Sequence, residues 1–386
     1  SGKIDDAIVA FERVLAVKPN HAGAQMDIAR AYFMAGSFDL AEASFRQLAA
    51  SNPPPIAQQT INRYLEAIDA RKRQTTPGWS GWAELGIGYD DNITGVPTDF
   101  GAAAQQSFGI VGIEATGNSI KRDAAFGTAS GSLEYSHPLG GGWGLFAGGE
   151  ARARGYPGET DFNSLYGDVR AGAALNHGPT QWRFVGGYQA FNQDGAYTGE
   201  PMITNDRRTA YGQGDWKLML DTKTQVGLGL QYAQVRFPTN EVEDFNQIYL
   251  QGSWLRSFET KGVPLLYVSA FVSDDSAVNN IPGTDTDKSK NLFGARGYGQ
   301  YSLTSALSAF TAVGFVLRRD KDPFARSTTV EDGEDRFGEF LLGLNWQFRK
   351  TCAMRAQWSY TRNASNIDLY DFKRNEVSTA VRCDIN

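Results

Sequence analysis

The sequence predicts a closed transmembrane antiparallel β-barrel of about 14 strands that follows a short α-helical module. Three observations predict this fold. A helical segment repeats at a fixed interval near the N-terminus, residue types alternate with period two from residue 78 onward, and the connections alternate between short and long. Long segments with period two are typical of membrane-spanning strands, and a fixed helical repeat is typical of stacked helix pairs.

The composition is compatible with such a barrel. The chain has 386 residues, a net charge of -6, 12% aromatic residues and 43 glycines. A mean hydropathy of -0.38 does not exclude a membrane protein, because lipid-facing and lumen-facing residues of a barrel average out. The sequence shows no basic stripe, so we expect no nucleic-acid partner.

The N-terminal segment contains helical repeats. Four residues recur after 34 positions: Gly2, Ala7, Phe11 and Pro19 return as Gly36, Ala41, Phe45 and Pro53. This interval is the period of tetratricopeptide repeats, whose small residues let paired helices approach closely. We expect residues 1–73 to form this module, truncated at its N-terminus because the first repeat lacks its first helix. A polar linker then covers residues 74–78.

The remaining residues, 79–386, form the predicted barrel. Its strands are long enough to cross a bilayer at a tilt. The predicted ranges are 78–90, 124–138, 142–156, 163–177, 180–193, 206–220, 224–237, 244–258, 264–275, 288–303, 306–320, 334–348, 352–363 and 371–385. A soluble β-sandwich with a helical cap is the alternative, but it does not explain so many long strands.

The connections predict the orientation of the barrel. Short turns, such as 139–142 and 178–180, alternate with longer loops, of which the longest covers 91–123. Outer-membrane barrels have short periplasmic turns and long outer loops. An even number of strands then returns both chain ends to the periplasm. We therefore expect a bacterial outer-membrane protein whose helical module lies in the periplasm.

Residue types predict which side of each strand faces the lumen. A charge on the lipid face near the bilayer centre costs about 2–4 kcal/mol, so charges at strand centres should face inward. The predicted lumen residues are Glu150, Arg152, Arg154, Asp168, Arg170, Asp215, Lys217 and Arg355. They would form either a wet wall or a network that rigidifies the barrel. Most strand aromatics share the lipid-facing parity, and five fit a periplasmic girdle: Trp79, Trp143, Trp182, Trp346 and Phe348.

The two cysteines test the register of the last hairpin. Paired residues of an antiparallel hairpin have a constant index sum, and Cys352 with Cys383 gives 735, centred between Ile367 and Asp368 in a predicted loop. A cross-strand disulfide fits the oxidising periplasm. It would either hold the hairpin closed while other strands move or simply stabilise it, and two free thiols are the alternative.

No residue pattern indicates catalysis. The three histidines are dispersed, so neither a metal site nor a His-based catalytic triad is expected. Asp285 and Asp287 lie in an acidic loop that does not complete a calcium-binding pattern. We therefore expect no catalytic residues, no metal and no cofactor, and a protein that moves or binds something.

Taken with the repeats and the barrel, three segments resemble the Slam family, the surface lipoprotein assembly modulators. They are Gly88–Ile93, Asn363–Asn366 and Tyr370–Ser378. The resemblance implies export of a protein cargo, often a lipoprotein, which the helical repeats would receive. The expected partners are this cargo, outer-membrane lipids and the barrel-assembly machinery.

By the repeat geometry, four residues should line the concave face that binds the cargo: Met26, Asp27, Arg30 and Phe33. For Met26 and Phe33, packing between repeats is the alternative. Two other functions also remain open. A polysaccharide-export porin would carry lumen aromatics stacked as a track, and a diffusion or structural barrel would use its repeats only to dock another envelope component.

Overall fold

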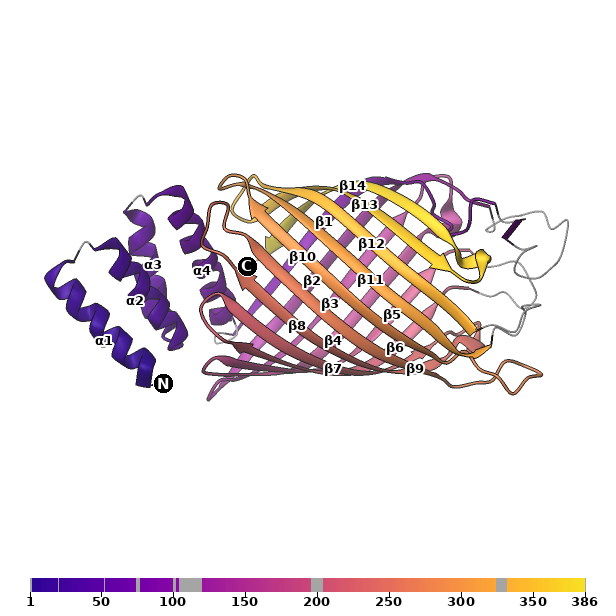
Figure 1. Cartoon of the computed structure of the whole chain (residues 1–386), viewed down its shortest axis with the longest axis horizontal. Helices are drawn as coiled ribbons and strands as arrows, with labels where there is room; N and C mark the ends of the chain where they lie inside the picture. Colours follow the sequence, from indigo (N-terminus) through magenta and orange to yellow (C-terminus); the bar gives the residue numbers. More distant parts are fainter. Residues whose placement is uncertain are drawn as a thin grey trace.

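The structure is a computed structural model that describes residues 2–19, 21–51, 53–73, 77–99, 102–103, 120–195, 204–323 and 332–385. Four helices precede a closed barrel of fourteen antiparallel strands (Figure 1). The predicted fold class is therefore confirmed. The predicted linker lies partly outside the described residues, since residues 74–76 are not among them.

The helices pack in sequence as antiparallel neighbours. Their bounds are α1 Gly2–Val17, α2 Ala22–Met34, α3 Phe38–Ala50 and α4 Pro55–Arg73. Ala29 and Ala41 are fully buried where the helices approach, as the repeat predicts, and Phe45 stacks on Tyr64 with ring centroids 4.7 Å apart. Gly36 follows α2 with φ 77°, a left-handed conformation in which glycine commonly ends helices.

None of the helices, as far as their residues are described, is long and apolar enough to cross a membrane.

The strand bounds lie within three residues of the predicted ones. They are β1 Gly78–Asp90, β2 Ala124–Gly140, β3 Trp143–Gly155, β4 Ser164–His177, β5 Thr180–Gln193, β6 Arg207–Met219, β7 Thr224–Arg236, β8 Phe245–Ser257, β9 Leu265–Ala277, β10 Lys290–Ser302, β11 Leu307–Pro323, β12 Asp332–Gln347, β13 Cys352–Ser365 and β14 Phe372–Ile385. The largest difference is at β11, which continues past an irregularity in its pairing with β12.

Each strand pairs with its neighbours in the chain, and β1 pairs with β14 to close the barrel. The short connections all lie at the end of the barrel that carries the helices, which we call the turn end (Figure 1). The opposite end, the loop end, carries the longer connections and three short 3₁₀ helices: Thr160–Phe162, Glu241–Glu243 and Asp368–Tyr370. Both β1 and the end of β14 therefore reach the turn end.

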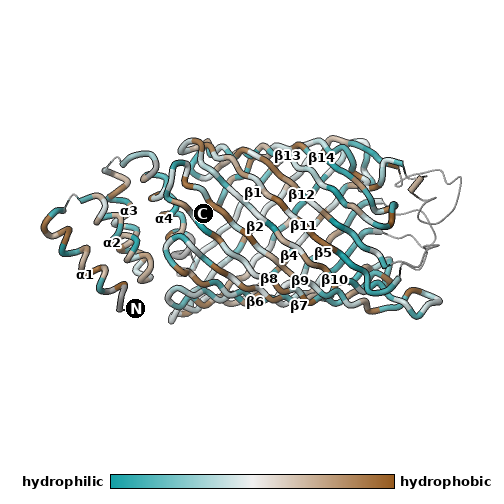
Figure 2. Tube along the Cα trace, viewed as in Figure 1, coloured by the Kyte–Doolittle hydropathy of each residue, from teal (hydrophilic) through white to brown (hydrophobic). Residues whose placement is uncertain are grey.

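Large apolar side chains cover the outside of the barrel. Leu85 and Ile87 on β1 are 68% and 66% exposed in the isolated chain, and hydrophobic and hydrophilic residues alternate along the strands (Figure 2). The predicted girdle residues are also exposed and lie at the turn end: Trp79, Trp143, Trp182, Trp346 and Phe348. This outer surface therefore contacts lipid.

The last hairpin has the register that the cysteines predict. Cys352 on β13 lies opposite Cys383 on β14, with the two Cα atoms 4.1 Å apart, and the structure joins them by a disulfide. The bond lies at the turn end of the hairpin. It links β13 to β14, and β14 is one of the two strands whose pairing closes the barrel.

Candidate functional site

The helices dock on the barrel through α2 and α4. Arg30 on α2 forms an ion pair with Glu259 in the turn between β8 and β9, and Lys223 in the turn between β6 and β7 also pairs with Glu259, at 2.9 Å. On α4, the Tyr64 hydroxyl donates a hydrogen bond of 3.4 Å to the Thr222 carbonyl. Burial raises the pKa of Tyr64, so its hydroxyl stays a neutral donor.

The structure places the four predicted cargo-binding residues within this docked module. Phe33 is only 7% exposed and packs edge-on against Phe38 and Tyr64. Met26 is partly buried against the same core, and Asp27 pairs with Arg30 at 3.1 Å. Phe33 therefore packs between helices, the alternative that the sequence left open, and cargo binding by these four residues stays a prediction.

A cavity of about 290 Å³ lies where the helices meet the barrel. Phe33, Tyr64 and Ala67 line it from the helices, and Met219 and Val263 line it from the barrel. Met219 also packs against the helical core. This junction cavity has largely apolar walls and lies beside the opening of the lumen at the turn end.

The predicted lumen residues lie on the inner side of the strands, where several form ion pairs. Arg154 contacts Glu376 at 2.7 Å and Asp90 at 3.5 Å. The other charged contacts are Arg152 with Glu150, Arg170 with Asp168 at 2.8 Å and Arg355 with Glu84 at 2.8 Å. These residues come from β13, β14, β1, β3 and β4, and we call this part of the wall the charged arc.

Several contacts of this arc pass over one or two intervening strands, which sequence reasoning did not foresee. Glu134 on β2 contacts Arg170 on β4 at 3.5 Å and Arg183 on β5 at 3.1 Å. Side chains of strands that are not neighbours converge on the concave inner side of a barrel and diverge on its outer side. The parity of Glu134 and Arg183 is the signal that could have identified them.

Two of the segments that resemble the Slam family contact each other at the loop end of the β1–β14 pair. The guanidinium of Arg374 contacts both carboxylate oxygens of Asp90, whose side chain is fully buried. Asp91 accepts two hydrogen bonds from Asn375, at 2.7 and 2.8 Å, and Asn92 donates one of 2.9 Å to the Lys373 carbonyl. Side chains as well as backbone therefore close the barrel.

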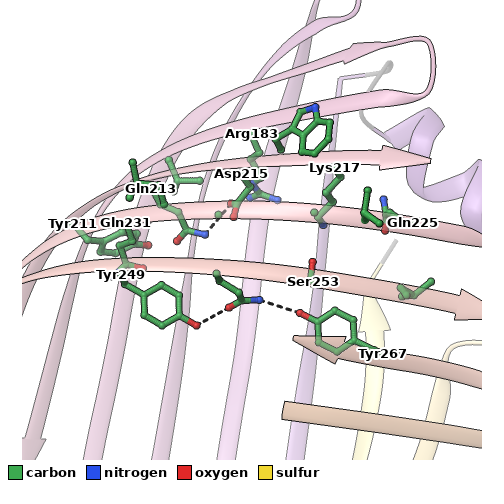
Figure 3. Close-up of a pocket in the computed structure, with 18 of the residues that line it drawn as sticks. Arg183, Tyr211, Gln213, Asp215, Lys217, Gln225, Gln231, Tyr249, Ser253 and Tyr267 are labelled. Atoms are coloured by element: carbon green, nitrogen blue, oxygen red, sulfur yellow. Dashed lines mark hydrogen bonds between the residues drawn. The ribbon is translucent and has the colours of Figure 1, made fainter. Parts of the chain in front are cut away.

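The opposite arc of the wall is uncharged over most of its height. Among the described residues of β7 and β8 that face the lumen, none is charged. We call this the neutral arc, formed on β7–β9 by Gln225, Gln231, Gln247, Tyr249, Gln251, Ser253, Tyr267 and Ser269. Its members bond to one another: Tyr249 donates to Gln251 at 2.6 Å, and Gln251 donates to Tyr267 at 3.0 Å (Figure 3).

The neutral arc lines a cavity of about 560 Å³ that three predicted lumen residues, Arg170, Asp215 and Lys217, also line. Asp215 accepts a hydrogen bond of 2.8 Å from Gln213, and Lys217 lies one lumen-facing position nearer the turn end (Figure 3). Amide and phenol groups can each both donate and accept hydrogen bonds. This wall can therefore bond to polar groups of either kind.

The lumen also contains aromatic residues, a set that the lipid-facing parity of most strand aromatics led us to miss. Phe126, Phe271 and Phe310 are less than a tenth exposed. Each ring lies against a glycine of the next strand, where a Cβ would collide with it: Gly88, Gly294 and Gly343. These rings lie flat on the wall and fill it. Phe271 also stacks on Tyr249, with ring centroids 5.1 Å apart, and Phe310 stacks on Tyr298, with centroids 6.3 Å apart.

Within the described ranges, no group of three or more His, Cys, Asp or Glu side chains is arranged to hold a metal ion.

Comparisons with known proteins support both parts of the chain. Residues 1–63 match the family model of the tetratricopeptide repeat. The chain is also similar to surface lipoprotein assembly modifier 1 of Neisseria meningitidis serogroup B, with 21% identity over 299 residues. The match covers 69% of this chain and 57% of that protein. The chain thus corresponds to little more than half of that relative's length.

Solved outer-membrane proteins have a similar barrel. The outer-membrane channel DcaP of Acinetobacter baumannii has 9% identity and a TM-score of 0.47, covering 80% of this chain and 97% of that one. OmpT of Vibrio cholerae has 10% identity and a TM-score of 0.44, covering 80% and 98%.

The repeats, the closed barrel and the matched relative agree. The chain is an outer-membrane β-barrel protein with N-terminal tetratricopeptide repeats, and it is similar to the surface lipoprotein assembly modifiers.

Proposed function

We propose that the protein is an outer-membrane translocator that delivers a protein cargo, either a surface lipoprotein or a secreted partner, from the periplasm to the cell surface. In this proposal the turn end and the helices face the periplasm. The name of the matched relative supports this cargo class, and short turns on the periplasmic side support the orientation.

The observation that carries the proposal is the docking of the helices beside the lumen. Arg30, Glu259 and Lys223 form one ion-pair cluster that joins α2 to two turns of the barrel. Tetratricopeptide arrays commonly present extended binding surfaces to other chains. A cargo segment released from the helices at this point would be next to the polar lumen.

A full-length variant tests the role of this docking. Arg30→Glu places two carboxylates against each other at the junction, so we expect the helices to undock and surface display of the cargo to fall. Arg46→Glu is the matched control, because among the described residues Arg46 forms its ion pair with Glu42 of its own helix, at 2.5 Å. Protease accessibility of the cargo on whole cells measures display. Unchanged display in the Arg30→Glu variant contradicts the proposal.

Photocrosslinking identifies the cargo. A photoreactive residue at Ala67 lines the junction cavity, and one at Leu40, which is 53% exposed, serves as the control. We expect Ala67 to capture a protein that also appears on the cell surface and whose display requires this chain. If both positions capture the same background proteins, the helices do not receive cargo at the junction.

The two other functions make different predictions. A diffusion barrel would let small solutes cross liposomes freely when the full chain is inserted. A polysaccharide exporter would bind glycans along lumen aromatics such as Tyr166, Tyr249 and Tyr267. Liposome swelling and glycan binding therefore separate both functions from protein translocation.

A further inference from the structure

One row of lumen residues crosses the barrel from the turn end to the loop end. Successive cross-strand partners on β14, β1, β2, β3, β4, β5 and β6 are Arg382, Glu84, Ser130, Arg152, Tyr166, Phe191 and Arg207. Arg382 lies near the turn end of β14, and Arg207 is the first residue of β6 at the loop end. Because barrel strands are tilted, a row across them climbs the wall.

A parallel row adds two more guanidinium groups. Arg355 and Arg154 belong to the next lumen-facing row, on β13 and β3. The five side chains, which we call the arginine band, line one cavity of about 730 Å³: Arg152, Arg154, Arg207, Arg355 and Arg382. Only two carboxylates, Glu84 and Glu376, line the same cavity.

In two ion pairs of the band, the arginine side chain is more exposed than its carboxylate partner. The Arg152 side chain is 63% exposed, whereas that of its partner Glu150 is 14% exposed. Arg355 is 43% exposed, and its partner Glu84 is 16% exposed. In these two pairs the carboxylates lie against the wall and the guanidinium groups face the lumen. Arg382 and its partner Asp384 are about equally exposed, at 45% and 50%. An entering molecule therefore meets the guanidinium groups of Arg152 and Arg355 before their carboxylate partners.

Arg207 has no counter-charge in the described part of the chain. Its guanidinium lies over the Phe191 ring, 4.9 Å from the centroid. An aromatic ring holds a guanidinium in place through its flat face and leaves the N–H groups at the edge available. Arg207 can therefore donate hydrogen bonds to an anion in the lumen.

We propose that the arginine band binds the carboxylate groups of an acidic, extended segment of the protein cargo. This proposal rests on the proposed function and names the chemistry of the segment that the lumen takes. Guanidinium groups bind carboxylates through paired, charge-assisted hydrogen bonds. The neutral arc on β7–β9 lies opposite the band arginines of β3, β13 and β14, and its amides and phenols can bond to main-chain N–H and C=O groups of the same segment.

Binding of a labelled oligoglutamate peptide to the detergent-solubilised full chain, followed by fluorescence anisotropy, tests the proposal. We expect saturable binding that weakens with added salt. Arg207→Gln should weaken it about tenfold, the factor that one charge-assisted hydrogen bond contributes. Arg207→Lys, which restores the charge, should recover part of the loss. Arg152→Gln should act in the same direction.

The matched control is Arg296→Gln. Arg296 also faces the lumen and lies over an aromatic ring, Phe271, at 5.5 Å, but it is outside the band. This variant should leave binding unchanged. Equal weakening by Arg296→Gln and Arg207→Gln would show general electrostatic attraction and overturn the proposal. Absence of oligoglutamate binding would also overturn it, as would tighter binding of an acidic glycan such as oligogalacturonate.

Failure of the proposed function would look different. In that case Arg30→Glu would leave cargo display unchanged, while oligoglutamate could still bind the full chain through Arg207. Conversely, if cargo display depends on Arg30 but the full chain binds no oligoglutamate, only the proposal for the arginine band is rejected. Heat-modifiable migration on a gel checks that each variant forms a folded barrel.

Discussion

The charged arc, which includes most of the arginine band, and the neutral arc are built on one barrel by one strand pattern. They nevertheless depend on neighbouring side chains in different ways. In the charged arc, Asp90 is fully buried and needs both Arg374 and Arg154. In the neutral arc, Gln251 bonds to Tyr249 and Tyr267 and carries no charge that needs a counter-charge. A charged wall is therefore stable only as a network, whereas a neutral wall tolerates the loss of a member.

The position of the helices sharpens this comparison. They dock on the turns that join β6 to β7 and β8 to β9, which lie at the turn end of the neutral arc. A segment that leaves the junction cavity would therefore meet amides and phenols first. Four of the five guanidinium groups of the arginine band lie on other strands, β3, β13 and β14, and Arg207 lies at the loop end of β6. The neutral arc thus lies nearer to the junction cavity than the charged arc does.

The largest expected effect comes from Arg374→Leu in the charged arc. This change leaves the more distant Arg154 and the backbone N–H of Asn92 as the described partners of the buried Asp90, so we expect the free energy of unfolding to fall by about 3–5 kcal/mol. Arg296→Leu is the matched change beside the neutral arc and should cost about 1 kcal/mol, through its lost contact with an aromatic ring. Urea unfolding from lipid vesicles measures both. Equal losses would contradict the difference between the arcs.

A smaller effect is expected from the disulfide that ties β13 to β14 within the charged arc. Cys352→Ser with Cys383→Ser should lower the stability by about 2–4 kcal/mol, because the cross-link restricts the unfolded chain. The same urea experiment with dithiothreitol on the unchanged protein should reproduce the loss. A double variant as stable as the parent would show that the barrel alone fixes this hairpin.

Much of this fold could be predicted because a barrel strand has one strict period. Parity alone assigned Arg152 and Arg355 to the lumen, and a constant index sum paired Cys352 with Cys383. These features depend only on neighbours along a strand or across one hairpin. The alternation of short turns and long loops then predicted which connections share one end of the barrel, and this did not require knowledge of the barrel diameter.

The contacts that could not be predicted join residues far apart in the chain. Arg30 and Glu259 are separated by 229 positions, and no local pattern brings a helix to one turn rather than another. Glu134 reaches Arg183 only because the wall curves. Phe33 is buried by Tyr64 of a later helix, so its apolar position could equally have indicated a binding face.

The glycines under the lumen rings provide the next prediction, with a still smaller effect. Gly294→Ala places a methyl group against the Phe271 ring at the edge of the neutral arc and should cost about 1–3 kcal/mol by overpacking. Gly186→Ala is the control, because no atom lies within 4 Å of a Cβ there. Urea unfolding again compares the two. A Gly294→Ala barrel as stable as the control would mean that the ring moves freely away from the wall.

The smallest expected effect is the coupling between Arg30 and Glu259, which fixes the helices to the turns of the neutral arc. Their side chains are 20% and 26% exposed, so water weakens the pair, and a double-mutant cycle with glutamine should give about 0.5–1 kcal/mol. Thermal unfolding of the helices by circular dichroism measures it, and high salt should reduce it. The Arg46–Glu42 pair within α3 is the control, with an expected coupling of about 0.3–0.5 kcal/mol. Coupling at the junction no larger than in α3 would mean that apolar contacts around Met219 and Phe33 hold the helices on the barrel, and that the ion pair only orients them.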